Sequence, residues 1–143
     1  RSGWLSRKRK KKRKTRVKKT TIDGYEFDSE LEANHYKIIR DDKDVELLER
    51  QKTFTLFERS PYTRVPSMKK GWLRKMIYTP DFIIRIKGID KPIAVESKGF
   101  ARKDYNMRKK LFIKFFGDDY YFLESGKNDL EWQLEEIKKV IKD

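Results

Sequence analysis

The sequence predicts one mixed α/β domain, in which helices flank a small mixed sheet and a basic arm precedes the domain. Three observations support this prediction. Segments with the apolar spacing of helices alternate with short apolar segments that are typical of strands. The 143 residues suffice for one compact core, and no internal repeat is present. Twelve of the 37 basic residues fall within the first 19 positions, ahead of the first acidic residue, Asp23.

Residues 1–21 are expected to form a flexible arm, because they are highly charged and poor in apolar side chains. The arm contains eight consecutive cations, which are Arg7, Lys8, Arg9, Lys10, Lys11, Lys12, Arg13 and Lys14. We predict that they bind nucleic acid, because a dense cationic run gains free energy by releasing counterions from a duplex. A solvated tail and a nuclear localisation signal are the alternatives. Residues 22–143 are expected to form the folded domain.

The domain is expected to open with a turn at Asp23-Gly24 and a helix from Ser29 to about Arg40. Ser29 and Glu32 have the spacing of a capping box, which starts a helix. The apolar face of this helix is expected to include Leu31, Ala33, Tyr36 and Ile39.

Strands are expected next. Residues 45–48 and 54–57 have strand composition, and apolar and polar side chains alternate along the second segment. Residues 59–73 contain two prolines, a glycine and several basic residues, which predict an exposed basic loop. The strongly apolar segments 76–86 and 93–95 are expected to be central strands of the sheet.

The last third of the chain is expected to add a helix at 105–116, a strand at 120–123 and a closing helix at 130–141. The first of these helices is basic, and we predict that its Arg108 and Lys110 contact nucleic acid. The alternative for both side chains is a solvated helix face.

The composition restricts the chemistry. The chain has no cysteine, and its single histidine, His35, is expected in the core or on a helix surface. A bound metal ion would therefore need oxygen ligands. No apolar run approaches the roughly 20 residues that a membrane helix needs, and the basic start lacks the apolar segment of a secretory signal, so we expect a cytoplasmic protein.

Two successive apolar segments carry carboxylates where an isolated charge is costly to bury. Asp81 lies in one of them, and Glu96 lies in the other with Lys98 two positions later. Strand alternation places Glu96 and Lys98 on one face, so both are expected to point toward Asp81 across the sheet. Two carboxylates, a backbone carbonyl and waters suit Mg²⁺, with Mn²⁺ as a substitute, and such an ion polarises a phosphodiester and activates water. Lys98 would orient this water and counter the charge of the transition state.

These segments resemble a known family. The sequences from Tyr78 to Phe82 (YTPDF) and from Val95 to Gly99 (VESKG) are similar to the two halves of the PD-(D/E)XK nuclease signature. The resemblance implies a restriction-endonuclease-like core and extends over most of residues 24–124. Within the superfamily, the chain is most similar to the phage endonuclease I family of Holliday-junction resolvases and to related phage nucleases.

The resemblance also implies roles for individual residues. The segment FDSELE, which ends at Glu32, is similar to the helix start that supplies the superfamily's extra acidic ligand, and Tyr105 to Phe112 is similar to its basic helix. The implied catalytic residues are Asp81, Glu96 and Glu32 as metal ligands and Lys98 as the catalytic lysine. A capping residue alone is the alternative for Glu32, and a buried ion-pair cluster in an inactive nuclease fold is the alternative for the other three.

The resemblance therefore implies a Mg²⁺-dependent endonuclease of phage or mobile-element type that cuts branched DNA, such as a Holliday junction, as a homodimer. Two alternatives remain open. One is a strand-cleaving subunit of a transposition-type complex, which would need a recombinase partner. The other is a nucleic-acid-binding protein without catalytic activity, in which the basic arm makes the contacts.

Overall fold

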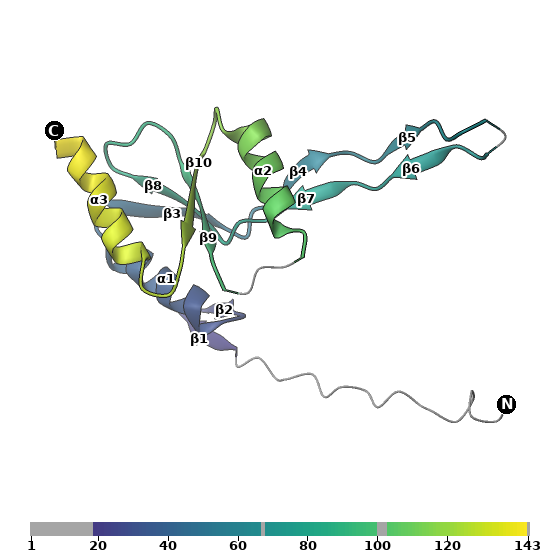
Figure 1. Ribbon diagram of the computed structural model, residues 1–143. Helices are drawn as coiled ribbons and strands as arrows, with labels where there is room; N and C mark the ends of the chain where they lie inside the picture. The colour runs from purple at the N-terminus through teal and green to yellow at the C-terminus, as the bar shows by residue number, and fades with distance from the viewer. Residues whose placement is uncertain (1–18, 67, 100–102, 143) are drawn as a thin grey trace, which may run out of the picture.

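The structure is a computed structural model that describes residues 19–66, 68–99 and 103–142 (Figure 1). The cationic run at 7–14 lies outside the described residues, together with most of the expected arm. The elements are, in chain order, β1 (Thr20–Ile22), β2 (Tyr25–Phe27), α1 (Glu30–Asp41), β3 (Val45–Arg50), β4 (Phe54–Phe57), β5 (Ser60–Tyr62), β6 (Gly71–Leu73), β7 (Met76–Tyr78), β8 (Phe82–Ile86), β9 (Ile93–Ser97), α2 (Tyr105–Phe116), β10 (Tyr121–Ser125) and α3 (Leu130–Lys142). The expected mixed fold, with helices flanking a small sheet, is confirmed. Within the described part of the chain, no helix has both the length and the apolar character that crossing a membrane requires.

A four-stranded mixed sheet forms the centre of the domain, with the strand order β10-β9-β8-β3. β9 runs parallel to β10 and antiparallel to β8, and β8 runs antiparallel to β3. β8 and β9 are the inner strands and are mostly buried, as their apolar composition predicts. β9 continues two residues beyond the predicted end, and these residues are Glu96 and Ser97.

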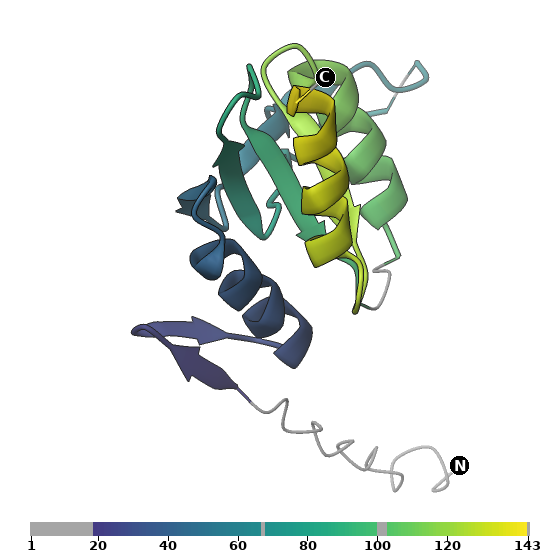
Figure 2. The ribbon, with the colours of Figure 1, turned by 90° about the vertical axis from the view of Figure 1, so that its left-hand side faces the viewer.

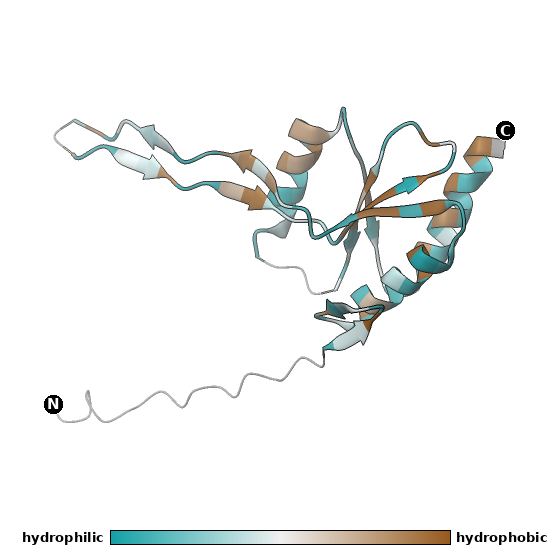
Figure 3. Ribbon diagram, turned by 180° about the vertical axis from the view of Figure 1, so that it is seen from behind, coloured by the Kyte–Doolittle hydropathy of each residue, from teal (hydrophilic) through white to brown (hydrophobic). Residues whose placement is uncertain are grey.

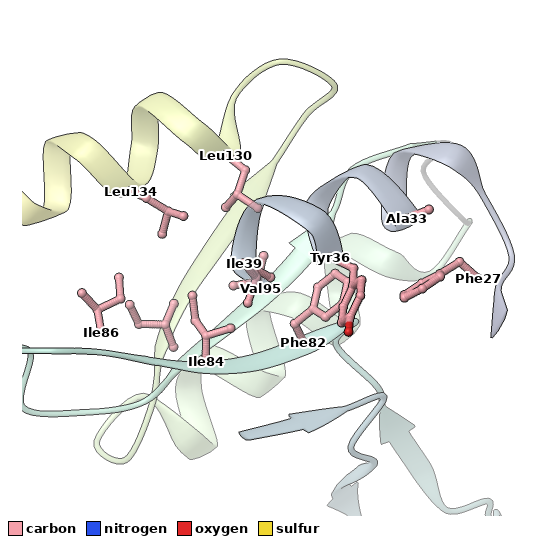
Figure 4. Packing of buried hydrophobic residues seen from close by; sticks show 11 residues of the cluster. Phe27, Ala33, Tyr36, Ile39, Phe82, Ile84, Ile86, Val95, Leu130 and Leu134 are labelled. Carbon is pink, nitrogen blue, oxygen red and sulfur yellow. The ribbon is translucent and has the colours of Figure 1, made fainter. Parts of the chain in front are cut away.

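Each face of this sheet packs against its own hydrophobic core. On one face, α1 and α3 cover side chains such as Phe82, Ile84 and Val95 (Figures 2 and 4). On the other face, α2 places the fully buried Phe112 against Ile83. Because successive strand residues point to opposite faces, this division assigns a face to every residue of β8 and β9.

Local sequence signals explain how α1 begins. The Ser29 hydroxyl accepts a hydrogen bond from the backbone N–H of Glu32 at 3.1 Å, which confirms the predicted N-cap. The preceding hairpin of β1 and β2 turns at Asp23-Gly24, where both residues have positive φ. Two successive residues with positive φ are typical of a tight two-residue turn, whose backbone twist matches that of the two strands it joins. β1 begins at Thr20, so the arm boundary expected at residue 21 falls inside a strand.

Two strand predictions need correction. The segment 76–86 is not one strand, because β7 and β8 belong to different sheets and are separated by Thr79, Pro80 and Asp81. Proline lacks the N–H that a central strand donates to its neighbour, so the ladder breaks there. The segment 59–73 is not only a loop, because it contains the hairpin formed by β5 and β6.

β4 to β7 together form a long two-stranded arm that extends from the domain beside α2 (Figures 1 and 3). Its inner part is the antiparallel pair β4 and β7, which packs against α2. Its outer part is the pair β5 and β6, which projects away from both cores. This β4–β7 arm thus begins at the α2-side core and ends in solvent.

Candidate active site

One pocket of about 810 Å³ collects most of the residues that the sequence singled out. Its walls come from the first turn of α1, the link between β7 and β8, the end of β9 and the first turn of α2. The predicted residues that line it are Glu32, Asp81, Glu96, Lys98 and Arg108. Residues more than 70 positions apart in the sequence therefore face one space.

Asp81 lies one residue before β8, and Glu96 lies in the neighbouring strand β9. Phe82 pairs with Val95, so the next position of this antiparallel register sets Asp81 opposite Glu96. Glu96 points to the α2 face, because it is two residues from Ala94 and accepts a hydrogen bond from Tyr78, which both belong to the core on that face. Asp81 Oδ2 also accepts a hydrogen bond from the Ser97 backbone N–H at 2.8 Å. The charges of Asp81 and Glu96 both help to raise the pKa of Tyr78 and of Tyr105, so the two carboxylates lie near the same two hydroxyls.

A buried tyrosine orients Glu96. The Tyr78 hydroxyl donates a hydrogen bond to Glu96 Oε2 at 2.6 Å, and Tyr78 is 5% exposed. Burial, and then the charge of Glu96, raises the pKa of Tyr78 well above its ordinary value. The Tyr78 hydroxyl therefore keeps its proton at neutral pH and can donate it to this carboxylate.

Lys98 extends from the end of β9 toward Glu124 of β10. Its Nζ lies 3.7 Å from Glu124 Oε2, and its side chain is 58% exposed. Glu124 also accepts hydrogen bonds from Tyr105 Oη at 2.5 Å and from Lys109 Nζ at 3.3 Å. Burial alone would raise the pKa of Glu124, but these two hydrogen bonds and the nearby lysine charges outweigh it, so its pKa lies below the ordinary value. Glu124 is therefore an anion that holds the exposed ammonium of Lys98 at the pocket.

Glu32 reaches the pocket from the start of α1 but faces a different set of partners. Its Oε1 accepts a hydrogen bond from Gln51 Nε2 at 3.4 Å and lies 3.8 Å from Arg50 Nη2. Glu32 is 5% exposed, and burial raises its pKa although Arg50 acts in the opposite direction. The backbone N–H of Glu32 donates to the capping Ser29 hydroxyl, whereas its carboxylate is directed to Gln51 and Arg50.

The two residues of α2 that were predicted to contact nucleic acid, Arg108 and Lys110, lie in different places. Arg108 lines the pocket, where its guanidinium donates to the Ile77 carbonyl and pairs with Asp104 at 2.8 Å. Lys110 is exposed and does not line the pocket. The structure therefore brings Arg108 to the site and leaves Lys110 on the outer surface of the helix.

His35 lies on the opposite face of the sheet, directly behind the site. It is fully buried, so of the two placements expected for it, the core and a helix surface, the structure shows the core. Its Nδ1 lies 2.6 Å from Ser97 Oγ and its Nε2 lies 2.9 Å from the Gly126 carbonyl. A neutral ring that donates from Nε2 to this carbonyl and accepts at Nδ1 from the hydroxyl satisfies both contacts. Because Ser97 binds Asp81 through its backbone, His35 fixes the strand end on which the site depends.

The donor set fits a hard divalent cation through two residues. Within residues 19–66, 68–99 and 103–142, no three acidic, histidine or cysteine side chains are grouped so that they could hold a metal ion. Glu32, Asp81 and Glu96 therefore share a pocket but are not arranged as three ligands of one ion. Mg²⁺ binds through one or two carboxylates and retains several waters, so Asp81 and Glu96 are sufficient for it.

Sequence reasoning missed three residues of this arrangement, Tyr78, Tyr105 and Glu124. Tyr78 stands inside the nuclease-like motif, but nothing in the motif shows where its hydroxyl points. Glu124 ends an apolar strand, as Glu96 does, and this similarity was an available signal. The strand was predicted to end at residue 123, so Glu124 fell just outside it.

Comparisons with known proteins give one match. A family model described as "Protein of unknown function (DUF1064)" matches residues 12–127. This range includes every residue that lines the pocket. No curated protein and no solved structure matches the chain.

Proposed function

We propose a function for this chain, which belongs to the DUF1064 family of proteins of unknown function: it is a divalent-metal-dependent DNA endonuclease. One observation carries the proposal. Asp81, Glu96 and Lys98 come from the ends of two neighbouring strands and line the same pocket. Two carboxylates and an ammonium group at one pocket form an arrangement suited to phosphodiester hydrolysis.

Asp81 and Glu96 would hold the divalent cation. When bound, Mg²⁺ supplies a Lewis acid that polarises the phosphate and lowers the pKa of water. Tyr78 limits the rotation of the Glu96 carboxylate by donating to one of its oxygens. The Ser97 N–H does the same for Asp81. Both carboxylates are thus oriented by groups that remain hydrogen-bond donors throughout the ordinary pH range, and such preorganisation favours metal binding.

Lys98 would orient the attacking water and counter the negative charge that develops on the phosphate. Its ammonium is exposed enough to meet a substrate, and its ion pair with Glu124 keeps it at the pocket before a substrate arrives. Arg108, also at the pocket, is placed to contact a neighbouring phosphate. Glu124 acts on the reaction only through Lys98 and is therefore a positioning residue.

The resemblance to junction-resolving nucleases extends the proposal to branched DNA and to a homodimer with one site for each strand. A strand-cleaving role beside a recombinase partner uses the same pocket chemistry. Activity of the isolated chain separates these two functions, since the second requires the partner.

The test is a cleavage panel with Mg²⁺ on four-way junction, flap, nicked, single-stranded and linear DNA. The full chain is expected to cut, and Asp81→Asn and Glu96→Gln are each expected to abolish cutting while DNA binding persists. Asp90→Asn is the matched control, because Asp90 is an exposed carboxylate that hydrogen-bonds Tyr121 outside the pocket. It should cut like the unaltered chain.

Retention of full activity by either pocket variant would remove the site assignment. Equal cutting of junction and linear DNA would remove the junction preference and leave the nuclease. If no substrate is cut with Mg²⁺ or Mn²⁺ and Lys98→Ala binds DNA as the unaltered chain does, the chain binds nucleic acid without cutting it.

A further inference from the structure

The outer part of the long arm has no role in the pocket. We call residues 58–75, which contain β5 and β6, the basic ribbon. Ser60 pairs with Leu73, and Tyr62 pairs with Gly71, so the ribbon is a regular antiparallel hairpin. Neither hydrophobic core includes any of its described residues. Its described side chains therefore contribute little to the packing of the two cores.

The charge of the basic ribbon is strongly one-sided and uncompensated. It has one acidic residue, Glu58, and six basic residues, which are Arg59, Arg64, Lys69, Lys70, Arg74 and Lys75. All six are exposed, and none forms an ion pair with a described residue. Six unpaired cations on a projecting hairpin repel one another, and a polyanion relieves this repulsion.

Aromatic side chains are interleaved with these cations. The Arg59 guanidinium carbon lies 4.0 Å from the centroid of the Trp72 ring, and Lys70 Nζ lies 6.0 Å from the same ring. Trp72 is 49% exposed. Strand alternation and the pairing of β5 with β6 place Arg59, Lys70 and Trp72 on one face of the hairpin. Cations flanking an exposed aromatic ring are typical of surfaces that bind nucleic acid.

The basic ribbon is continuous with the candidate active site. Ile77, Tyr78 and Thr79 line the pocket, and the ribbon ends only two residues before them. Residues 58–65 can span roughly 26 Å at about 3.3 Å each. Successive phosphates of one strand advance about 3.4 Å along a duplex, so the ribbon can follow about seven of them.

We propose that the basic ribbon is the surface that holds duplex DNA beside the candidate active site. A two-stranded ribbon fits the major groove, and its cations can reach the phosphates that border that groove. The choice of DNA as the polyanion rests on the proposed nuclease function. The charge, the exposure and the position of the basic ribbon are observed independently of that proposed function.

The test measures binding of the full chain to a labelled duplex by fluorescence anisotropy in EDTA, over a range of salt concentrations. The variant Arg59→Ala/Lys70→Ala/Arg74→Ala is expected to reduce the slope of log affinity against log salt by about 2.7, at about 0.9 for each phosphate that is no longer neutralised. Affinity at 0.1 M salt should fall on the order of 10²-fold. The matched control, Lys37→Ala/Lys43→Ala/Lys87→Ala, removes three exposed lysines outside the ribbon and should leave the slope unchanged.

A second variant separates the loss of charge from unfolding of the hairpin, which the first variant could cause by removing the cations that contact Trp72. Lys69→Ala/Lys75→Ala removes two cations that make no ring contact, and it should lower the slope by about 1.8. Equal reductions of the slope in the ribbon and control variants would show that only net charge matters and would overturn the proposal. So would self-association of the free chain that depends on the ribbon residues.

Failure of this proposal is distinguishable from failure of the proposed function. Binding in EDTA requires no cleavage, so the ribbon can be supported even if the chain cuts nothing. Conversely, if the ribbon variants bind and cut like the unaltered chain, the nuclease stands and the ribbon proposal fails.

Discussion

Replacing Tyr78 by phenylalanine removes a single oxygen from the candidate site and leaves the ring in place. This oxygen donates to Glu96 Oε2 at 2.6 Å, and Tyr78 is 5% exposed, so little water can replace the missing donor. The ring itself packs against Phe112, with centroids 5.3 Å apart, and this contact persists in the variant. Tyr78→Phe therefore isolates one hydrogen bond.

A hydrogen bond to a charged group contributes about 1.5–3 kcal/mol, and we expect the variant to lose stability in this range. For a domain of this size, the loss corresponds to a fall in Tm on the order of 5–12 °C. Loss of an outer partner of a metal ligand typically lowers metal affinity or activity about 10- to 100-fold. The Mg²⁺ concentration that supports half-maximal cleavage should rise accordingly.

Thermal unfolding in EDTA measures the stability effect, and cleavage over a Mg²⁺ titration measures the effect on the site. Tyr121→Phe is the control, because its hydroxyl donates to Asp90 at 2.8 Å on an exposed surface outside the pocket. This control should change Tm little and leave the Mg²⁺ requirement unaltered. If Tyr78→Phe matches the control in both measurements, the oriented Glu96 carboxylate is not what the site depends on.

Two further predictions concern the stability of the fold and the N-terminal basic arm, residues 1–21. Burial holds the pKa of His35 below its ordinary value of 6.5, although the Gly126 carbonyl acts in the opposite direction, so the unfolded chain binds a proton more readily than the folded chain. The free energy of unfolding should therefore fall as the pH drops below about 6.5, and urea denaturation between pH 7.5 and 5.5 should show a smaller fall in His35→Gln. Removing residues 1–18 should lower the salt slope of DNA binding by about 0.9 for each phosphate that the arm neutralises, while calorimetry of the shortened chain should give an unchanged Tm. An unchanged salt slope would mean that the arm does not contact DNA.

The elements with strong periodicity were predicted closely. The segments 54–57 and 105–116 match β4 and α2, α1 differs from its prediction by one residue at each end, and α3 differs by one residue at its C-terminal end. The Ser29 cap explains the start of α1, because its signal is local and needs no knowledge of the tertiary fold.

The errors arose where strand pairing decides the structure. Apolar residues at both ends of 76–86 favoured a single strand, although Thr79, Pro80 and Asp81 interrupt them and Pro80 cannot donate to a central ladder. Pro61 and Gly71 favoured a loop, yet a two-stranded ribbon tolerates both because each strand has only one partner.

The same distinction between local sequence signals and strand pairing decides which residues of the candidate site could be predicted. Asp81, Glu96 and Lys98 could be identified because charges in apolar strands stand out in a sequence. Glu124 could not be assigned as the partner of Lys98, because this pairing depends on the parallel register of β9 and β10. Register is fixed by the whole buried face and not by local residues.

The pairing of Ser60 with Leu73 means that the hairpin of β5 and β6 can be replaced by another hairpin. These residues lie directly opposite each other, so a short turn can join them and replace everything between. β4, β7 and the pocket behind them would keep their contacts. Hairpins of other lengths and charges could be grafted at this point, which, under the proposed function, would let DNA preference be engineered separately from the chemistry.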